Sequence, residues 1–544
     1  MEIRASEYGI MPGEHIGKSL NEMFRAMANI EGEKTIVFEP GDYYIDSEDA
    51  VYTHELRITN TIGEREWRKG EDIQGKRIAM YIESVKDMTL EGNGARFILD
   101  GVMTNMALLS CERVAIKNIT IDVVRPNVHK MTITDVKPFY FDFVLDKDSR
   151  YEKRGSRYYF VGKDYEYDFL DKAKCSWWIG YLREDSKDII ERSMHPLMSA
   201  WRIKELGEGV FRAYSFLHSN IKKGNTYHLY DVRRKDVGIF IDSSRDIVLE
   251  GVTQHFNYSL GIVGQNSENI TIDSVRMAPS DDTELEMVSV ADFIHLCMCR
   301  GDIKIRKGYF LGAGDDCLNV HGIHYQIVNI DGNKIVVRFM HPQAYGFNPL
   351  RSGDIIEYVD RKTLLKKGSA KILSSRMLNE YDIELTLDST AYADTRYCIE
   401  DISACPNLEF TDNYMSRIIT RGILVTTRGK VLIENNNFDS CSMHSILFSD
   451  DANSWYESGR VLDATIRGNT FRYTPMYNIY IKPENSVHED YVHGDILIEG
   501  NTFKGTRKGG IYAKSTRSVT IRDNVVEHGT LRVDTENVGT VNRD

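Results

Sequence analysis

The chain of 544 residues is longer than an ordinary single domain, so several domains or a repeat architecture are expected. Its 42% hydrophobic residues suffice for a large core, and its formal net charge of −13 contains no long run of one sign. This charge argues against nucleic acid and membrane partners, because both require a cationic surface. It argues more weakly against a strongly acidic polymer as substrate.

The N-terminal stretch has no apolar segment of the kind found in secretory signals, and no apolar run approaches the ~20 residues of a membrane span. The eight cysteines form no CxxC pair and are typical of buried free thiols in a reducing compartment. We therefore expect a cytoplasmic protein with no metal site and no cofactor. A secreted protein whose signal has been removed is the alternative.

The chain begins with apolar residues at helical spacing (14 to 30), followed by a strand at 35 to 45. A helix at this point suits a β-solenoid, whose first coil would otherwise leave an open edge. Short units then recur in which alternating apolar residues precede a Gly or Asn turn. They occur at 87 to 101, 113 to 124, 246 to 256, 269 to 277, 302 to 310, 407 to 415, 431 to 438, 464 to 471, 496 to 503 and 518 to 526.

Equivalent positions of these units recur at intervals of 23, 32 or 33 residues. Ile433, Ile466 and Ile498 follow one another at 33 and 32 residues, and both Phe410 to Ile433 and Ile498 to Ile521 span 23. Such periods, in β-branched strands without intervening helices, predict a parallel β-helix. Asn at the corners fits, because it tolerates left-handed backbone angles and can form a side-chain ladder. A β-sandwich or propeller would not explain the repeated N-x-F corners.

Two segments interrupt this rhythm. Residues 129 to 235 are rich in aromatic side chains, and residues 325 to 400 read as antiparallel strands with a hairpin signal at Asp331-Gly332. Both are predicted to be small β-barrel or β-sandwich insertions, and the second should wall the cleft beside it. The predicted organisation is a helix cap with the first coils (1–128), insertion one (129–235), central coils (236–324), insertion two (325–400) and C-terminal coils (401–544).

Three aspartates carry the chemical prediction. Asp292 precedes the adjacent pair Asp315 and Asp316 by 23 residues, so the coil period should stack them at the strand spacing of ~4.8 Å. Close carboxylates raise the pKa of one group, which can then act as a general acid while a neighbour activates water. These are the groups of a glycosidase. One coil plus a lateral offset favours the ~6.5–9.5 Å separation of inverting enzymes over the ~5–5.5 Å of retaining ones. Without such context, an adjacent aspartate pair is commonly a solvated turn.

Two motifs, ADFIHLCMCRG (291 to 301) and GAGDDCLNVHG (312 to 322), resemble the signature of glycoside hydrolase family 110, the α-1,3-galactosidases. RGILVTTRGKVLIENNNF (421 to 438) and ILFSDDANSWYESG (446 to 459) look like the same family. The resemblance covers most of the chain, both insertions included. It implies a right-handed parallel β-helix with β-barrel insertions and an inverting, metal-free mechanism, distantly like the family 28 polygalacturonases. The sequence departs from the pattern at Cys317 and Leu318, where smaller residues are expected.

The resemblance also implies roles for the three aspartates. Asp315 would be the general acid, and Asp292 and Asp316 would hold and deprotonate the attacking water. Which of those two is the base stays open. His295, His321 and Asn319 belong to the same motifs and are candidates for substrate binding, although lone histidines are more often packed or at the surface.

Further substrate-binding candidates lie outside these two motifs. Arg421 and Arg428 flank a strand that should stack on the same face, although surface salt bridges are the alternative for both. Trp455 stands in a polar, turn-like stretch, where an indole suits stacking on a pyranose ring. The remaining candidates are Glu457, Asp451 and His255.

The sequence thus predicts an exo-acting inverting enzyme that releases terminal α-1,3-linked galactose from an oligosaccharide or glycan. A linear Galα1-3Gal end and a branched blood group B-type end are both compatible, as is a homodimer. A polysaccharide lyase or a polygalacturonase-like enzyme is the rival on this solenoid. A lyase would need a Lys, Arg or Tyr base, and no basic cluster lies near residues 292 to 322. A non-enzymatic β-helix binding module is a third alternative.

Overall fold

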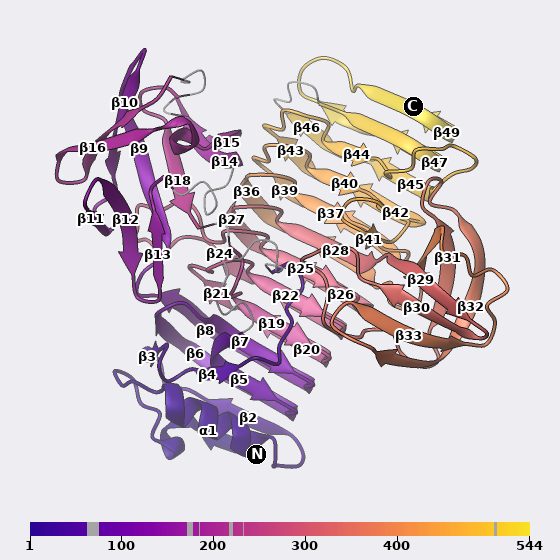
Figure 1. Cartoon of the computed structure of the whole chain (residues 1–544), viewed down its shortest axis with the longest axis horizontal. Helices are drawn as coiled ribbons and strands as arrows, with labels where there is room; N and C mark the ends of the chain where they lie inside the picture. The colour runs from indigo at the N-terminus through magenta and orange to yellow at the C-terminus, as the bar shows by residue number, and fades with distance from the viewer. Residues whose placement is uncertain (62–74, 171–177, 184, 217–220, 232, 505–508) are drawn as a thin grey trace.

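The computed structural model describes residues 1–61, 75–170, 178–183, 185–216, 221–231, 233–504 and 509–544. A parallel β-helix runs from the N-terminal to the C-terminal end of the molecule, and the two insertions project from opposite sides of it (Figure 1). The predicted fold class, a parallel β-helix with two inserted β domains, is therefore confirmed. Among the described helices, none has the length and apolar character required to cross a membrane.

The coils of the solenoid stack into three parallel faces. The first face comprises β1 (Glu2–Arg4), β2 (Lys34–Val37), β6 (Lys86–Asp100), β8 (Glu112–Val123), β20 (Arg245–Glu250), β23 (Glu268–Asp273), β26 (Arg300–Arg306), β35 (Asn407–Thr411), β38 (Lys430–Glu434), β42 (Asp463–Arg467), β45 (His493–Glu499), β47 (Ile511–Arg522) and β49 (Val533–Arg543). The second comprises β5 (Lys76–Glu83), β7 (Thr104–Leu109), β19 (Ile239–Asp242), β22 (Ile262–Gln265), β25 (Ile294–Cys297), β28 (Leu318–Ile323), β37 (Ile423–Val425), β40 (Ile446–Phe448), β44 (Ile479–Ile481) and again β47. The third comprises β3 (Asp42–Asp46), the C-terminal parts of β6 and β8, β21 (Thr253–Gln254), β24 (Arg276–Met277), β27 (Tyr309–Ala313), β36 (Tyr414–Ile418), β39 (Asn437–Phe438), β43 (Thr470–Arg472), β46 (Thr502–Lys504) and β48 (Val525–Val526).

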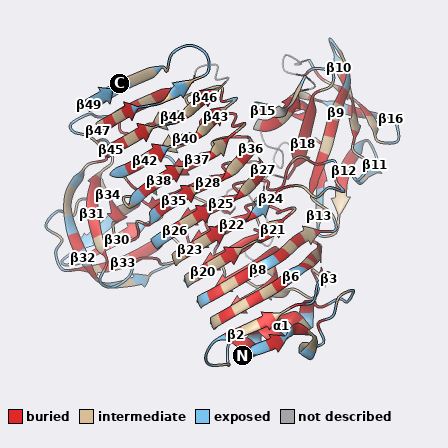
Figure 2. Cartoon of the chain, turned by 180° about the vertical axis from the view of Figure 1, so that it is seen from behind, coloured by how far each residue is buried: buried red, intermediate tan, exposed pale blue. Residues whose placement is uncertain are grey.

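The register of the first face confirms the coil periods read from the sequence. Phe410, Ile433, Ile466, Ile498 and Ile521 lie opposite one another on successive strands. All five side chains are buried, and buried and outward positions alternate along these strands (Figure 2). The apolar positions of the repeat therefore form one continuous core inside the coils.

The helix α1 (Gly17–Met27) lies at the N-terminal end of the solenoid, as predicted (Figure 1). It buries Leu20, Met23 and Phe24. The buried Asn21 accepts a hydrogen bond from the Tyr81 backbone N–H and donates one to the Ala79 carbonyl, each 2.8 Å long. β4 (Val51–Thr53) pairs with β5 only as far as Ile78, and the Asn21 side chain satisfies main-chain groups of β5 beyond that point.

The corners contain the expected asparagine ladder. The left-handed backbone conformation and the ladder side chain, however, belong to two neighbouring residues and not to one. The left-handed backbone angle falls on the residue just before each ladder asparagine, as in Asn435, with φ of 57°. The buried asparagine that follows donates from Nδ2 to the Oδ1 of the next asparagine along the solenoid, at 2.9 or 3.0 Å. The ladder runs through Asn413, Asn436, Asn469, Asn501 and Asn524.

Insertion one forms an antiparallel sheet with a small additional sheet. The seven strands, in spatial order, are β15 (Ser186–Met194), β14 (Trp178–Arg183), β18 (Thr226–Tyr230), β9 (Val128–Lys137), β10 (Tyr140–Leu145), β17 (Val210–Tyr214) and β16 (Arg202–Gly207). The small sheet consists of β11 (Tyr151–Arg154), β12 (Arg157–Gly162) and β13 (Tyr165–Asp168). The aromatic side chains noted in the sequence form the core of this insertion, which includes the buried rings of Phe141, Phe143, Phe160 and Phe211.

Insertion two is a closed barrel. Its strands follow the order β29 (Tyr325–Asp331), β30 (Lys334–Arg338), β33 (Asp382–Leu387), β32 (Lys366–Met377), β31 (Ile355–Asp360) and β34 (Tyr397–Asp401). The hairpin predicted at Asp331-Gly332 joins β29 to β30, with Asp331 opposite Lys334 and Gly332 at φ 59°.

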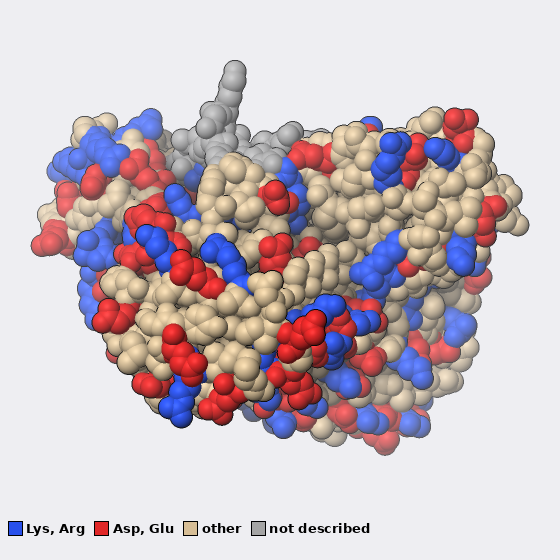
Figure 3. All heavy atoms as spheres, turned by 90° about the horizontal axis from the view of Figure 1, so that it is seen from below, with Lys and Arg blue, Asp and Glu red and all other residues tan. Residues whose placement is uncertain are grey.

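The cysteines and the surface charge agree with the sequence in the described part of the chain. Seven cysteines are free, and all of them except Cys405 are buried; Cys175 lies outside the described residues. On the described part of the face drawn in Figure 3, acidic and basic side chains are interspersed rather than gathered into one large basic patch.

Candidate active site

The three predicted aspartates meet in space, but in a different register from the one expected. Ile294 on β25 lies opposite Leu318 on β28, so this coil has 24 residues and not 23. Asp292 is therefore level with Asp316, and the backbone N–H of Asp316 donates to Oδ1 of Asp292 at 3.1 Å. The expectation that Asp292 stacks on Asp315 is wrong by one residue, because the loop before β28 is one residue longer than the period assumed.

One oxygen from each of the three carboxyl groups lies within 4.8 Å of the other two. Their exposure differs sharply: the Asp315 side chain is 22% exposed, whereas those of Asp292 and Asp316 are 2% and 1% exposed. Asp315 is therefore partly open to solvent, while Asp292 and Asp316 are almost fully buried.

These aspartates line a cavity of about 330 Å³. The cavity is walled by the N-terminal region, by insertion one with the segment that follows it, and by C-terminal coils. The described lining residues do not include any from insertion two. The prediction that this barrel walls the cleft is therefore wrong, in that no described residue of the barrel borders the cavity directly. Lining residues outside the solenoid motifs include Asn60, Arg192, Tyr230, Arg234, Thr420 and Met443.

Arg421 lies in this cavity, where it binds Asp316 rather than standing free for a sugar. Its guanidinium donates from Nε to Oδ1 at 2.8 Å and from Nη2 to Oδ2 at 2.6 Å, and its backbone N–H also donates to Oδ1. The Thr420 hydroxyl donates to the same carboxylate. With a further contact from Nε to Oδ2 at 3.0 Å, Asp316 accepts five hydrogen bonds, which fix its position.

Arg234 is the principal residue that sequence reasoning missed. Its Nη2 donates to Oδ2 of Asp315 at 2.6 Å, and its Nη1 donates to Oδ1 of Asn60 at 3.1 Å. Arg234 follows insertion one, 81 residues before Asp315, so no local motif joins the two. The pair Arg233-Arg234 at the return to the solenoid was the available signal. The sequence around residues 292 to 322 contains no basic cluster. In the folded chain, however, Arg234 and Arg421 place two cations beside the aspartates.

The two arginines separate the pKa values of the three carboxyls. Burial and the nearby charge of Asp315 raise the pKa of Asp292 to about 7, while burial raises that of Asp316 to about 6 against the opposing effect of Arg421. Burial would also raise the pKa of Asp315, but Arg234 and Arg421 hold it below its usual value. Split pKa values of this kind are typical of sites that perform acid and base chemistry.

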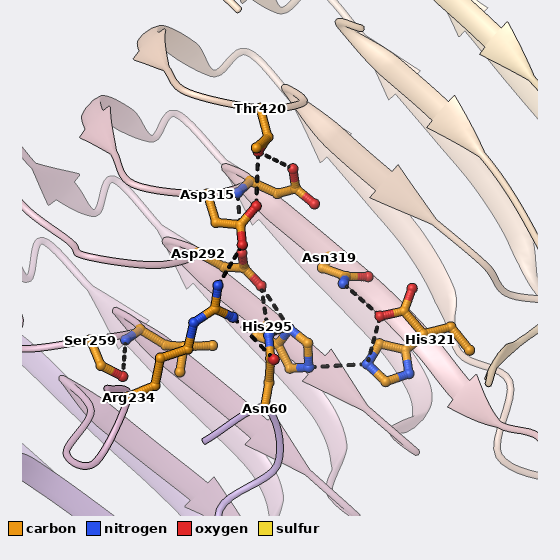
Figure 4. A network of polar contacts seen from close by, with 12 residues as sticks. Asn60, Arg234, Ser259, Asp292, His295, Asp315, Asn319, His321 and Thr420 are labelled. Atoms are coloured by element: carbon orange, nitrogen blue, oxygen red, sulfur yellow. Dashed lines mark hydrogen bonds and ion pairs between the residues drawn. The ribbon is translucent and has the colours of Figure 1, made fainter. Parts of the chain in front are cut away.

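His295 and His321 lie behind Asp292 and away from the cavity lining (Figure 4). His295 Nδ1 is 2.8 Å from Oδ2 of Asp292, and the two histidines approach each other through Nε2 atoms 3.0 Å apart. Both rings are buried, and burial lowers the pKa of His295 to about 3 and that of His321 to about 4. The structure thus connects these histidines to the carboxyl cluster and does not place them against the open cavity.

Asn319, Trp455 and Glu457 do line the cavity. Asn319 Nδ2 donates to Oε1 of Glu457 at 3.2 Å. The Trp455 side chain is 53% exposed, and its indole stacks on His341 of insertion two with centroids 4.8 Å apart. The barrel therefore contributes indirectly, by supporting the aromatic ring that faces the cavity.

Three predicted binding residues lie elsewhere, and for these the expected place in the groove is wrong. Arg428 lies in the connection between β37 and β38 and is buried against Glu357 and Glu400 of insertion two. Asp451 accepts backbone hydrogen bonds from residues 453 to 455 and so shapes the loop that carries Trp455. His255 borders a different cavity, lined by Arg125 and Asp282 among others.

The carboxyl spacing does not support the stereochemical argument made from coil geometry. Oxygens within 4.8 Å of one another are closer than the ~6.5–9.5 Å separation associated with inversion. The site nevertheless holds what glycoside hydrolysis requires: one carboxyl that reaches the cavity, and recessed carboxyls beside it that can position water.

Comparisons with known proteins agree with this chemistry. Residues 334–396 match the family model described as GLAA-B beta-barrel domain II. The chain is 34% identical over 444 residues to alpha-1,3-galactosidase A of Bacteroides fragilis (81% of this chain, 71% of that protein). It is 32% identical over 470 residues to alpha-1,3-galactosidase A of Bacteroides thetaiotaomicron, covering 85% of this chain and 80% of that protein.

Among solved structures, a family 28 exopolygalacturonase of Yersinia enterocolitica aligns with a TM-score of 0.42 and 8% identity, over 99% of this chain and 78% of that one. This likeness is too loose to carry an inference. The sequence identity to the Bacteroides proteins, sustained over most of both chains, is decisive. The chain therefore belongs to the alpha-1,3-galactosidase family of glycosidases.

Proposed function

We propose that the chain is an exo-acting α-1,3-galactosidase of glycoside hydrolase family 110, which hydrolyses terminal α-1,3-linked galactose with inversion. The observation that carries this proposal is the unequal exposure of the three carboxyls, with Asp315 facing the cavity and Asp292 and Asp316 recessed. A general acid must contact the glycosidic oxygen, and all three carboxyls border the cavity, but only the Asp315 side chain among them has substantial exposure, at 22%.

The surroundings of Asp292 and Asp316 favour inversion, and this argument does not depend on the distance between the carboxyls. A retaining enzyme needs a carboxylate that bonds directly to the anomeric carbon. Asp316 is enclosed by Arg421 and Thr420, and Asp292 by His295 and the Asp316 backbone, so neither is free to approach a sugar. Either can hold a small water molecule, which then attacks the anomeric carbon.

The cavity dimensions favour removal of single terminal sugars. A space of about 330 Å³ walled by three regions of the chain suits a terminal residue and part of the next one better than a long polymer. Trp455 offers its exposed ring for stacking on a pyranose, and Glu457 and Asn319 offer polar atoms to hydroxyl groups.

A lyase or a polygalacturonase-like enzyme is less well supported. A lyase needs an unprotonated base beside a uronate carbon, whereas Arg234 and Arg421 are both engaged in ion pairs with the aspartates. A uronate carboxylate would also have to approach three carboxyl groups. Formation of an unsaturated product, detected by its ultraviolet absorbance, would revive the lyase alternative.

The function is tested with a glycan panel. Linear Galα1-3Gal and branched fucosylated blood group B-type ends are compared with α-1,4- and α-1,6-linked galactosides and with oligogalacturonate. Release of galactose from the α-1,3-linked glycans alone is expected, and NMR of the first-formed sugar should show β-galactose. Asp315→Asn should lose turnover while still binding, whereas the exposed Asp302→Asn on β26 should match the wild-type chain. No release from any α-1,3-galactoside would overturn the proposal.

A further inference from the structure

The hydrogen bonds behind Asp292 have a direction that can be read from the atoms involved. The starting point is the Gly322 carbonyl, which lies 2.7 Å from Nδ1 of His321. A carbonyl oxygen only accepts, so His321 Nδ1 carries the hydrogen. Burial lowers the pKa of this ring to about 4, so the imidazole is neutral and its Nε2 has a lone pair.

The hydrogen bonds of His295 run in the same donor-to-acceptor direction as those of His321. His295 Nε2 lies 3.0 Å from the His321 Nε2 lone pair and therefore donates to it. Since burial lowers the pKa of His295 to about 3, this ring is also neutral, and its Nδ1 is an acceptor. That acceptor lies 2.8 Å from Oδ2 of Asp292. Two lone pairs would face each other at this distance unless the Asp292 carboxyl supplies a hydrogen.

We propose that His321 and His295 form a one-directional relay that keeps the resting proton of the site on Asp292, and that Asp292 is the general base of the hydrolysis. This inference rests on the proposed glycosidase function and decides which recessed carboxyl accepts the proton from water. His295 and His321 are positioning residues, since they act through Asp292. Asp316 stays ionised beside Arg421 and holds the neighbouring groups in place.

The proton count of one turnover agrees with this assignment. In the resting site Asp292 is protonated and Asp315 is ionised against Arg234. When substrate binds, the proton moves from Asp292 to Asp315, a step that one bridging water can serve because their nearest oxygens lie within 4.8 Å. Asp315 then gives this proton to the leaving oxygen as the glycosidic bond breaks. Water bonds to the anomeric carbon and releases a proton to Asp292, so the product state is the resting state.

Asn60 does not account for the relay. Its Nδ2 lies 3.4 Å from both Asp292 Oδ2 and His295 Nδ1, too far for a strong bond to either. The charged and titratable groups facing the relay from the elements packed around it are Arg234, Asp315, Asp316, Arg421, Glu457 and His341. Glu457 would favour an imidazolium at His321, with Oε1 3.8 Å from Nε2, while His341 opposes one there. Arg234 opposes an imidazolium at His295.

The pH dependence of kcat/KM on a released galactoside tests the relay during turnover. The active free enzyme holds one proton on the pair Asp292 and Asp315, so loss of that proton sets the basic limb. His321→Phe removes the acceptor for His295, which can then take the other tautomer and donate to Asp292, thereby favouring the ionised carboxylate. The basic limb should move toward acid by about one pH unit or more. An unmoved limb in a folded variant would overturn the relay.

The matched control is His129→Phe. His129 is also a buried histidine, but it stacks on Phe160 in insertion one, with centroids 3.9 Å apart, and takes no part in the relay. Its replacement should leave both limbs of the pH profile unchanged. A shift as large as that of His321→Phe would show that loss of any buried histidine moves the profile, and would also overturn the relay.

A second measurement needs neither activity nor a folded His321 variant. Infrared difference spectra of the wild-type chain between mildly acidic and alkaline pH should contain carbonyl stretches of buried protonated carboxyls, to which Asp316 and Asp401 also contribute, and Asp292→Asn should lose one component of this signal. Nitrogen NMR of labelled histidine should show neutral His295 and His321, each with one protonated nitrogen. Absence of the Asp292 signal, or a doubly protonated His321, would overturn the relay even if galactose is released. A present signal in a chain that releases no galactose would refute the proposed function and leave the relay standing.

Discussion

Arg234 and Asp315 form an ion pair of 2.6 Å that joins the segment after insertion one to the central coils. The contact places a fixed cation on Asp315, the most exposed of the three aspartates that line the cavity. It also means that insertion one, through the segment that returns from it, affects the acid group of the site as well as the shape of the wall.

Replacing Arg234 should change the acid limb of the pH profile. The guanidinium stabilises the ionised form of Asp315, so Arg234→Met should raise the pKa of that carboxyl. A second proton would then enter the site at higher pH, and the acid limb of kcat/KM should move toward neutral by about one pH unit. Arg234→Lys retains the charge and serves as control. An acid limb that stays in place in Arg234→Met would contradict this role.

Asp292 should make the chain less stable as pH rises. Its folded pKa of about 7 exceeds the ordinary value of 3.8, so its stabilising proton is fully present below pH 3.8 and is lost as pH rises to about 7. Across that window the free energy of unfolding should fall by about 1.4 kcal/mol per pH unit from this group. Asp292→Asn cannot ionise and keeps a donor for His295, so its Tm relative to wild type should rise with pH.

The measurement for Asp292→Asn is thermal unfolding across the same pH window. Asp302→Asn, on the exposed side of β26, provides the comparison and should follow the wild-type curve. A constant difference in Tm between Asp292→Asn and wild type would show that Asp292 titrates alike in the folded and unfolded chains.

Arg428 should matter for stability and not for catalysis. Its side chain is 10% exposed and is paired with Glu357 and Glu400. Glu357 keeps Lys366 and Arg460 as partners, but Arg428→Met leaves the buried carboxylate of Glu400 without the arginine that neutralises it. We expect a loss of about 3–5 kcal/mol in unfolding free energy. Arg522→Met, which breaks an exposed pair with Glu499, should lose about 0–1 kcal/mol. A large rise in KM in folded Arg428→Met would restore Arg428 to the substrate site.

Trp455 should contribute to binding more than to the chemical step. Its exposed ring lines the cavity and offers stacking rather than proton transfer, so Trp455→Ala should raise KM by about tenfold with little change in kcat. Trp455→Phe keeps an aromatic face, so its KM should lie between those of the wild-type chain and Trp455→Ala. A fall in kcat with unchanged KM would place the indole in the transition state instead.

The repeat architecture could be predicted because its rules act over short stretches of sequence. Each coil is closed by a local corner, and alternating side chains face in or out whatever lies on the next coil. The spacing of Ile433, Ile466 and Ile498 therefore already gave the register found in the structure. The same reasoning failed for Asp292 and Asp315, because a corner one residue longer changes the register without disturbing the apolar pattern.

The sequence by itself thus determined the β-helix, the two insertions and the three aspartates as a group. Only the tertiary structure decided which aspartate faces the cavity, because that depends on a one-residue shift between adjacent coils. It also decided the partners of these groups: Arg234 and Asn60 come from segments 81 and 232 residues away from Asp315 and Asp292. Electrostatic interactions and hydrogen bonds depend on distance in space. The protonation states of the site could therefore be inferred only from the folded structure, in which those segments lie together.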